Sequence, residues 1–326
     1  MYSEGTDILF LPDPKGFMEM THFSQFTVRG QRTSLLALTA LAVLGVSAPA
    51  AQAQDAYSQA VLAANPLAYF QLGSVNQPSA VNGFTTTFNG SASVTAPGGG
   101  APIASNPGNA GASFNGTPNP NGFGSGPSIT TSLGSANATG ASTLLGWFSL
   151  AQTPGTAGTS GTYYIAGRSQ FGNDLDLQIQ GDNRLHFFAN GGGEVNAALP
   201  AFAFNKYYFF AASEDPLTQV SSLYINGALA ATSTGDVSRS LHTSAFTIGD
   251  SSVFNPRNFD GSIDDVAFYD YALTSDQVKG IYASANTPGA TPPVPEASTT
   301  VSLGLLLMLA GMAAVVRRKR GPKYSA

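Results

Sequence analysis

The side chains of this 326-residue chain that could carry chemistry are its carboxylates, amides and three histidines, because the sequence contains no cysteine. That absence excludes thiol nucleophiles, disulfides and cysteine-ligated zinc or iron–sulfur sites. The histidines, His22, His186 and His242, are widely spaced, which argues against a histidine metal site. Neither His186 nor His242 lies near a G-x-S-x-G nucleophile motif. The sequence therefore gives no support to nucleophilic serine or cysteine catalysis.

Paired carboxylates could instead hydrolyse a glycosidic bond, which requires one nucleophile and one acid/base about 5 Å apart. The nearest candidate is the segment Asp174-Leu175-Asp176-Leu177-Gln178. Gln178 cannot attack or donate a proton as a carboxyl group does, so the second role is unfilled. Asp264 and Asp265 are adjacent, and neighbours on a strand face opposite ways, so we expect them to have structural roles. The prediction is a protein that is not an enzyme.

The elements that position these residues are predicted to be short strands. Only 10% of the residues are charged and 37 are glycine, which argues against long helices. Strand patterns cover 67–72, 142–150, 162–168, 174–180, 184–190, 206–212, 220–225, 246–249 and 262–269. Asn226-Gly227 predicts a type I′ hairpin turn, and Thr274-Ser275-Asp276-Gln277 is a capping box that opens a short helix. Many short strands without a βαβ rhythm predict an all-β, antiparallel jelly-roll sandwich.

Residues 73–142 are rich in Gly, Asn, Ser, Pro and Thr and leave two interpretations open. One is a disordered linker, and the other is a set of short strands with long turns. Apolar islands around Phe84, Phe88, Phe114 and Ile129 favour strands, because disordered segments are poor in aromatic residues. Residues 55–285 hold fourteen acidic and six basic side chains. This acidic body argues against nucleic acid as a partner.

The first 53 residues have the pattern of an N-terminal extension followed by a signal peptide. Arg29 and Arg32 precede fourteen uncharged residues, 35–48, and Ala51-Gln52-Ala53 forms an A-x-A cleavage site. This order predicts export and cleavage after Ala53.

The C-terminal region combines a motif, an apolar segment and a basic stretch. Residues 297–316 are uncharged and long enough for one transmembrane helix. The basic stop Arg317-Arg318-Lys319-Arg320 follows, and Val294-Pro295-Glu296 precedes it. Together these parts resemble a PEP-CTERM sorting signal over 294–320, although Ala297 replaces the family's second proline. The resemblance implies an exosortase-type sorting protease as partner and a Gram-negative host. An ordinary stop-transfer anchor is the alternative.

The body, residues 54–286, resembles bacterial laminin-G-like domains of the concanavalin A-like lectin/glucanase superfamily. The resemblance is carried by Pro66–Gly73, by Ser222–Gly227, which is similar to the "LYVNG" hairpin, and by Phe259–Thr274, which is similar to the closing "F-x-G-x-I-D-E-V-x-x-Y-x-x-A-L-S" segment. It implies a jelly roll that recognises glycans or proteins. The same superfamily contains glycoside hydrolases with an E-x-D-x-E strand. In this sequence both terminal Glu positions of that pattern are altered, to Asp174 and Gln178.

The same resemblance implies calcium in some members, although no cofactor is certain. A hard cation takes several oxygen ligands. Candidate ligands are Asp174, Asp176, Asp250, Asn258 and Asp260. The alternative is that these residues cap turns.

The predicted organisation is an extension and signal peptide (1–53), the sandwich (54–286), a linker (287–293), the sorting signal (294–320) and a tail (321–326). The expected protein is exported across the inner membrane, anchored there by its C-terminal helix until it is processed, and then placed at the cell surface or in the matrix. It is expected to bind an extracellular glycan or protein. A purely structural matrix role is the main alternative, and a glycoside hydrolase is a minor one.

Overall fold

The computed structural model describes residues 8–12, 18–22, 55–116, 126–136, 140–156, 160–168, 175–189, 193–235, 244–251 and 257–288. The chain divides into two compact units, Met1–Ala51 and Gln52–Ala326. In the first unit β1 (Ile8–Pro12) pairs antiparallel with β2 (Met18–His22), a hairpin that the sequence pattern does not predict. The proposed signal peptide and the C-terminal sorting signal lie outside the described residues and stay predictions. Within the described ranges, no helix is both long and apolar enough to cross a membrane.

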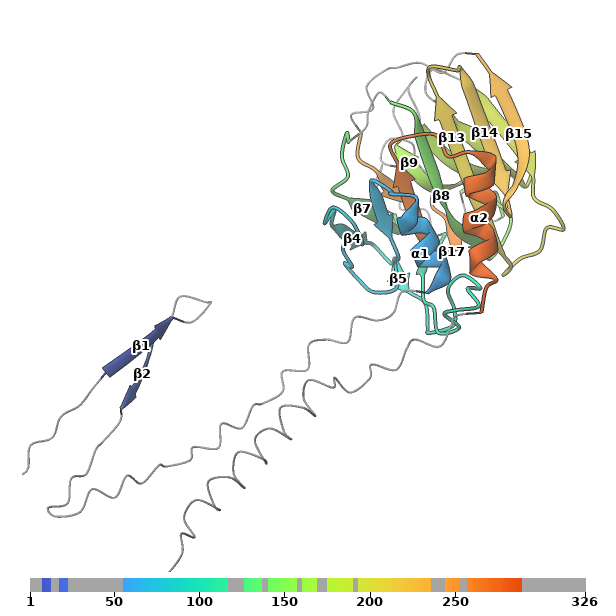
Figure 1. The fold of residues 1–326 in the computed structure, drawn as a ribbon. Coiled ribbons are helices and arrows are strands. Elements are labelled where there is room, and N and C mark those ends of the chain that lie inside the picture. Colours follow the sequence, from blue (N-terminus) through green and yellow to red (C-terminus); the bar gives the residue numbers. More distant parts are fainter. Residues whose placement is uncertain are drawn as a thin grey trace, which may run out of the picture. The chain divides into compact units, whose positions relative to one another are not determined.

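The second unit is an all-β sandwich of two antiparallel sheets, as predicted (Figure 1). One sheet has seven described strands in the order β12 (Glu194–Ala198), β11 (Arg184–Phe188), β10 (Leu175–Gln180), β9 (Thr162–Arg168), β16 (Thr247–Ile248), β7 (Ser128–Thr131) and β4 (Thr86–Asn89). The other has eight, in the order β15 (Ala228–Thr234), β14 (Val220–Ile225), β13 (Tyr207–Asp215), β8 (Ser142–Leu150), β17 (Asp260–Tyr269), β6 (Ala112–Asn115) and β5 (Ser93–Val94), with β3 (Ala68–Phe70) paired to β17.

The sequence pattern located most of these strands. The bounds of β8, β9 and β14 coincide with the predicted ranges. Asn226 and Gly227 have φ of 49° and 76°, the positive values that a type I′ turn needs. Residues 73–142 contain the short strands β4, β5, β6 and β7, so the strand interpretation of this region is confirmed.

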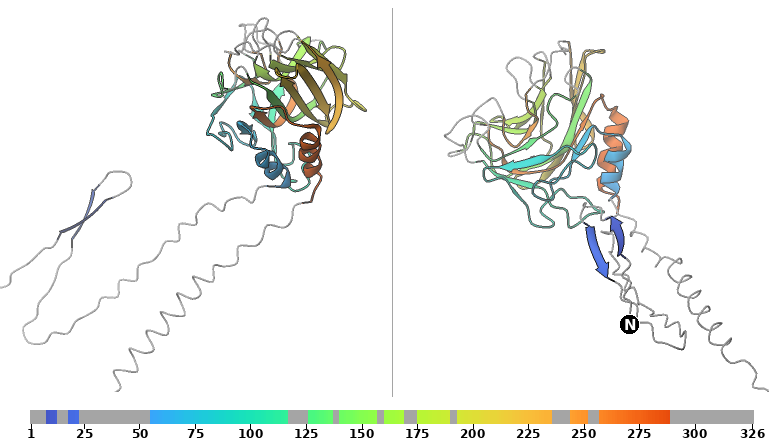
Figure 2. Two further views of the ribbon diagram at one scale, coloured as in Figure 1. Left: turned by 45° about the horizontal axis from the view of Figure 1, so that its top comes forward. Right: turned by 90° about the vertical axis from the view of Figure 1, so that its left-hand side faces the viewer.

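Two apolar cores hold the sandwich together. The first lies between the sheets and includes Phe148, Leu177, Phe187 and Phe210. The second lies on the outer face of the eight-stranded sheet, where α1 (Ala56–Ala63) and α2 (Ser275–Ala285) lie side by side (Figure 2). Its residues include Trp147, Phe209, Tyr57 and Val278. Because both clusters are built within 57–285, a fragment of residues 54–290 keeps both cores complete.

Both helices begin at a capping residue, and the sequence pattern predicts the cap of α2. Asp55 caps α1 by accepting a hydrogen bond from the backbone N–H of Ser58 at 2.8 Å. Thr274 and Gln277 form the predicted capping box at α2. Val278 and Ile281 on one side of α2 are buried in the second core. The capped helices thus close the outer face of the eight-stranded sheet.

The expectation that Asp264 and Asp265 face opposite ways is wrong. The register of β17 against β8 shifts between Asp264 and Ala267, and Asp265 has a φ of +52°. This bulge turns both carboxylates toward the second core, because it breaks the alternation of the strand. Oδ2 of Asp264 accepts hydrogen bonds from the backbone N–H of Ala101 and from Nδ2 of Asn109, each at 2.7 Å. The structural role predicted for this pair is therefore confirmed.

Candidate functional site: a polar face on three strands

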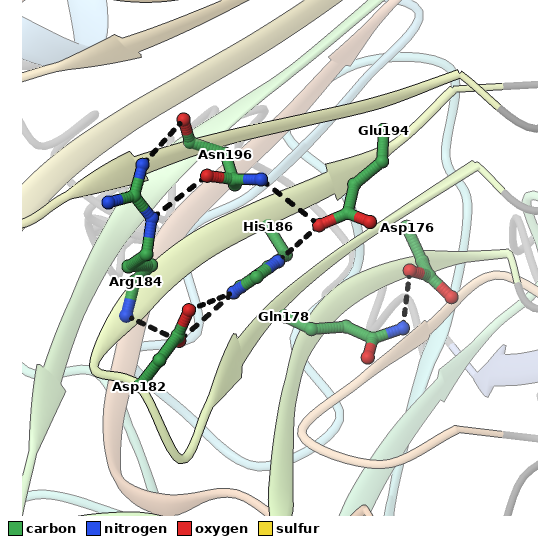
Figure 3. Close-up of polar contacts among 7 residues, drawn as sticks. All are labelled: Asp176, Gln178, Asp182, Arg184, His186, Glu194 and Asn196. Atoms are coloured by element: carbon green, nitrogen blue, oxygen red, sulfur yellow. Dashed lines mark hydrogen bonds and ion pairs between the residues drawn. The ribbon is translucent and has the colours of Figure 1, made fainter.

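The outer face of the seven-stranded sheet carries two neighbouring hydrogen-bonded groups of polar side chains. We call the two groups together the polar face and define it as Asp176, Gln178, Asp182, Arg184, His186, Glu194 and Asn196 (Figure 3). Side chains alternate along β10, since Leu175, Leu177 and Ile179 enter the first core and the intervening side chains point away from it. Register places Gln178 opposite His186 and His186 opposite Asn196, so three strands contribute to one row.

His186 is held between two carboxylates. Its Nδ1 lies 2.5 Å from Oε1 of Glu194, and its Nε2 lies 3.0 Å from Oδ1 of Asp182. Both contacts are hydrogen bonds at once only when the imidazole carries two protons. Burial raises the pKa of Asp182, but hydrogen bonds from His186 and from the backbone N–H of Arg184 outweigh it and lower that pKa overall. The ring of His186 is thereby fixed in position and is buried.

Arg184 is also engaged within the polar face. Its Nε donates to Oδ1 of Asn196 at 2.8 Å, and one terminal nitrogen donates to the backbone oxygen of Asn196 at 3.4 Å. Asn196 in turn donates from Nδ2 to Oε1 of Glu194 at 3.3 Å. The network ties strand β12, at the edge of the sheet, to β11 and to the β10–β11 turn.

Asp176 and Gln178 form the buried end of the polar face. Nε2 of Gln178 donates to Oδ1 of Asp176 at 2.7 Å, and both side chains are buried. Oε1 of Gln178 has no hydrogen-bond partner among the described residues, although Gln178 is only 1% exposed. A buried acceptor without a donor is costly, so this carbonyl is a position for an additional hydrogen-bond donor. The partner of Asp176 at this position is therefore an amide and not a carboxyl group.

Most aromatic side chains of the described sandwich are part of its cores. Tyr163, Phe187 and Phe209 are fully buried. Phe188 is an exception, because it is half-buried and its ring stacks beside His186 at 6.4 Å with an interplanar angle of 15°. It gives the polar face one accessible aromatic surface.

The predicted calcium ligands fall in separate places. Asp174 lies outside the described residues, and Asp176 belongs to the polar face. Asp260 begins β17 and accepts a hydrogen bond from Nε2 of Gln152. Among the described residues, no group of three or more His, Cys, Asp or Glu side chains is placed to hold a metal ion.

Asp250 and Asn258 are the pair of candidate ligands that the fold brings together. Asn258 hydrogen-bonds the Asp250 carboxylate, and burial raises the pKa of Asp250 to about 6. Oδ1 of each residue is buried without a hydrogen-bond partner in the described structure. Asn258 packs against Gly126, where a Cβ would lie 1.7 Å from Nδ2 of Asn258. Two unsatisfied oxygens fit part of the ligand set of a hard cation.

The other site residues named from the sequence cannot be placed. Ala51 and Ala53 of the cleavage site, Val294-Pro295-Glu296 and the basic stop 317–320 lie outside the described residues. Four residues of the polar face are not predicted as site residues from the sequence: Asp182, Arg184, Glu194 and Asn196. The alternation Glu194-Val195-Asn196 is a strand signal, but it is short and runs into two alanines.

Comparison with known proteins supports the fold. Residues 123–279 match the Laminin_G_3 family model, described as the Concanavalin A-like lectin/glucanases superfamily. No match was found among curated proteins. A structure of botulinum neurotoxin type C, concerned with its interaction with two ganglioside molecules, is 12% identical with a TM-score of 0.51, covering 69% of this chain and 53% of that one.

Two further solved structures are similar to the sandwich. Domain 4 of AbnA, a GH43 extracellular arabinanase from Geobacillus stearothermophilus in complex with arabinotriose, is 19% identical with a TM-score of 0.48, covering 66% of this chain and 97% of that domain. Trypanosoma rangeli sialidase with the inhibitor DANA is 15% identical with a TM-score of 0.48, covering 68% of this chain. The match spans about a third of the sialidase, 33% of its chain. These two likenesses carry no argument about the function of this chain.

Proposed function

We propose that this protein is an exported, non-catalytic recognition protein that binds extracellular polysaccharide through the polar face. The observation that carries the proposal is an ordered row of hydrogen-bonding side chains in which the carboxylates of Asp182 and Glu194 are exposed, beside a buried Oε1 of Gln178 that has no hydrogen-bond partner among the described residues. Sugar hydroxyls are donors that suit such an acceptor, and the partly exposed ring of Phe188 suits the apolar side of a sugar ring.

The rigidity of the polar face also supports recognition. His186 is fixed from both ring nitrogens, and Asn196 is fixed by Arg184 and Glu194. Side chains that are already ordered lose little conformational entropy when a ligand binds. The fold likeness to a structure concerned with a neurotoxin's interaction with two ganglioside molecules is consistent with this proposal. A protein ligand is the alternative occupant.

A non-catalytic role is favoured over glycoside hydrolysis by the chemistry at Gln178. Retaining hydrolysis needs a second carboxyl about 5 Å from the first. Beside Asp176 stands the amide of Gln178, which is bonded to it and cannot supply that group. A purely structural matrix role without a ligand remains the second candidate, since a rigid sandwich could serve it without a discrete binding site.

The sequence patterns at the two termini support export of the protein to the cell surface or the matrix. The signal-peptide pattern before Ala53 supports export across the inner membrane, and the PEP-CTERM resemblance over 294–320 supports a Gram-negative host. We place the protein first at the inner membrane, held by its C-terminal helix. Processing by an exosortase-type protease then releases it to the cell surface or the matrix.

Retention of residues 54–290 on the host's own exopolysaccharide, with calcium and then with chelator, tests this function. Saturable retention supports a glycan-binding module. Loss of retention on chelation would indicate that binding requires a calcium ion, for which Asp250 and Asn258 would supply part of the ligands. No retention in either condition removes the glycan function and leaves the structural or protein-binding role.

A further inference from the structure

The polar face is unbalanced in charge and in hydrogen-bonding capacity. It holds three carboxylates, on Asp176, Asp182 and Glu194, against one arginine and one histidine. Two of these carboxylates reach the surface, since the side chains of Asp182 and Glu194 are 46% and 39% exposed. The body of the chain is acidic as well, with fourteen acidic and six basic residues between 55 and 285.

The cationic groups of the polar face are already committed to protein partners. Both ring nitrogens of His186 contact carboxylates. Arg184 is bound to Asn196 through two of its three nitrogens. An incoming anionic sugar therefore meets few available donors and several like charges.

The acceptors, by contrast, retain unused capacity. Oε1 of Glu194 accepts from His186 and Asn196, whereas its second oxygen has no hydrogen-bond partner among the described residues. The Glu194 side chain is 39% exposed, so a ligand can reach it. The Asp182 side chain is 46% exposed and offers a second carboxylate that a ligand can reach. Oε1 of Gln178 lies buried below the same row, without a hydrogen-bond partner among the described residues. A matching ligand must bring donors, and preferably positive charge.

We infer that the polar face takes a glycan that bears primary amines, such as a partly deacetylated hexosamine polymer, and discriminates against sugars that bear carboxylates. This inference rests on the proposed function and names its substrate class. An ammonium group offers three donors and forms charge-assisted hydrogen bonds with a carboxylate. Phe188 offers the ring surface beside it. The acidic body attracts a cationic polymer over longer range, and salt screens that attraction.

The test is calorimetric titration of residues 54–290 with three oligosaccharides of equal length: glucosamine, N-acetylglucosamine and galacturonate. The titrations use a pH at which the sugar amines are protonated and the carboxylates ionised. The expected order of affinity is glucosamine, then N-acetylglucosamine, with galacturonate weakest. Glu194→Gln removes the charge and keeps an acceptor for His186, so it is expected to weaken glucosamine binding about tenfold. N-acetylglucosamine binding is expected to change less than threefold.

Asp276→Asn is the matched control, because Asp276 is an exposed carboxylate at the start of α2, on the outer face of the other sheet. It changes the net charge equally and should leave binding unchanged. Equal affinity for the amine and the acetylated oligosaccharide, or tighter binding of galacturonate, would overturn the inference and leave glycan binding standing. Binding of poly-lysine that weakens on Glu194→Gln as much as glucosamine binding does would also overturn it, since the polar face would then recognise positive charge and not a sugar. No binding of any oligosaccharide would overturn both the inference and the proposed function.

Discussion

The hydroxyl of Tyr69 donates a 2.5 Å hydrogen bond to Oδ1 of Asp265, a residue 196 positions later in the chain. This bond joins the opening strand β3 to the bulge of the closing strand β17, inside the second core. The same hydroxyl lies 3.1 Å from Oγ of Ser58 on α1. One phenol therefore links the first helix, the first strand of the sandwich and the last strand.

Loss of this hydroxyl should destabilise the domain. Tyr69→Phe leaves Asp265 without its donor, and a buried acceptor left without a partner costs about 1–3 kcal/mol. Urea unfolding of residues 54–290 measures the change. Tyr282→Phe is the control, because the hydroxyl of Tyr282 makes no hydrogen bond within the described residues and its ring is only partly buried. Equal stability of Tyr69→Phe and the wild type would contradict the role assigned to this bond.

Stability should depend on pH through the same carboxylates. Burial raises the pKa of Asp265 to about 7 and raises that of Asp264 well above its usual range, with the like charge of Asp265 adding to the effect. Between about pH 4 and about pH 7 the folded state binds protons that the unfolded state has released. The contribution of this pair to the free energy of unfolding is therefore fully present below about pH 4 and is lost as the pH rises through about 7.

Asp265→Asn tests this pH dependence. The amide oxygen can still accept from Tyr69, and Asn tolerates the positive φ of 52° at this position. We expect the variant to show a flatter dependence of the melting midpoint on pH between 4 and 8, and to be more stable than the wild type at pH 8. A curve parallel to that of the wild type, or to that of the exposed control Asp276→Asn, would refute the prediction.

Calcium is expected to bind at Asp250 and Asn258 and to stabilise the fold. The cation would satisfy the two buried oxygens that have no hydrogen-bond partner in the described structure. We expect calcium to raise the melting midpoint of residues 54–290, chelator to lower it, and Asp250→Asn to reduce that difference. A midpoint that does not move over a wide range of calcium concentration speaks against any site.

Processing should depend on the C-terminal motif. Combined replacement Pro295→Ala and Glu296→Ala is expected to leave the full-length protein in the membrane fraction of the native host, because the sorting protease would no longer recognise its motif. Immunoblotting of membrane and extracellular fractions follows the outcome, with Thr299→Ala as control. Unchanged processing of the double variant would point to an ordinary anchor instead.

The sequence predicted what depends on neighbours in the chain. The alternation of Leu175, Leu177 and Ile179 located β10, the Asn226-Gly227 pair located a hairpin, and Thr274 with Gln277 located a helix start. Each of these signals is local, because a turn, a cap or a strand face is set by residues a few positions apart.

The polar face could be predicted only in part, because it depends on register between strands. The strand pattern over 184–190 covers His186 and Phe188, but the contact of His186 with Glu194 requires the pairing of β11 with β12. The orientation of Asp265 was missed for a similar reason. Adjacent carboxylates on a regular strand are expected to face opposite ways. At the bulge, Asp265 instead contacts Tyr69, a residue far away in the sequence, which a local pattern does not reveal.

The most direct test of the central claim is retention of Gln178→Met and wild-type fragments, residues 54–290, on the host exopolysaccharide. Methionine keeps the size of the glutamine side chain but removes its carbonyl, and melting curves check that the fold is kept. The account predicts saturable retention of the wild type and of Asp276→Asn, and a loss of at least tenfold in affinity for Gln178→Met. Equal retention of a folded Gln178→Met variant would contradict glycan binding at the polar face.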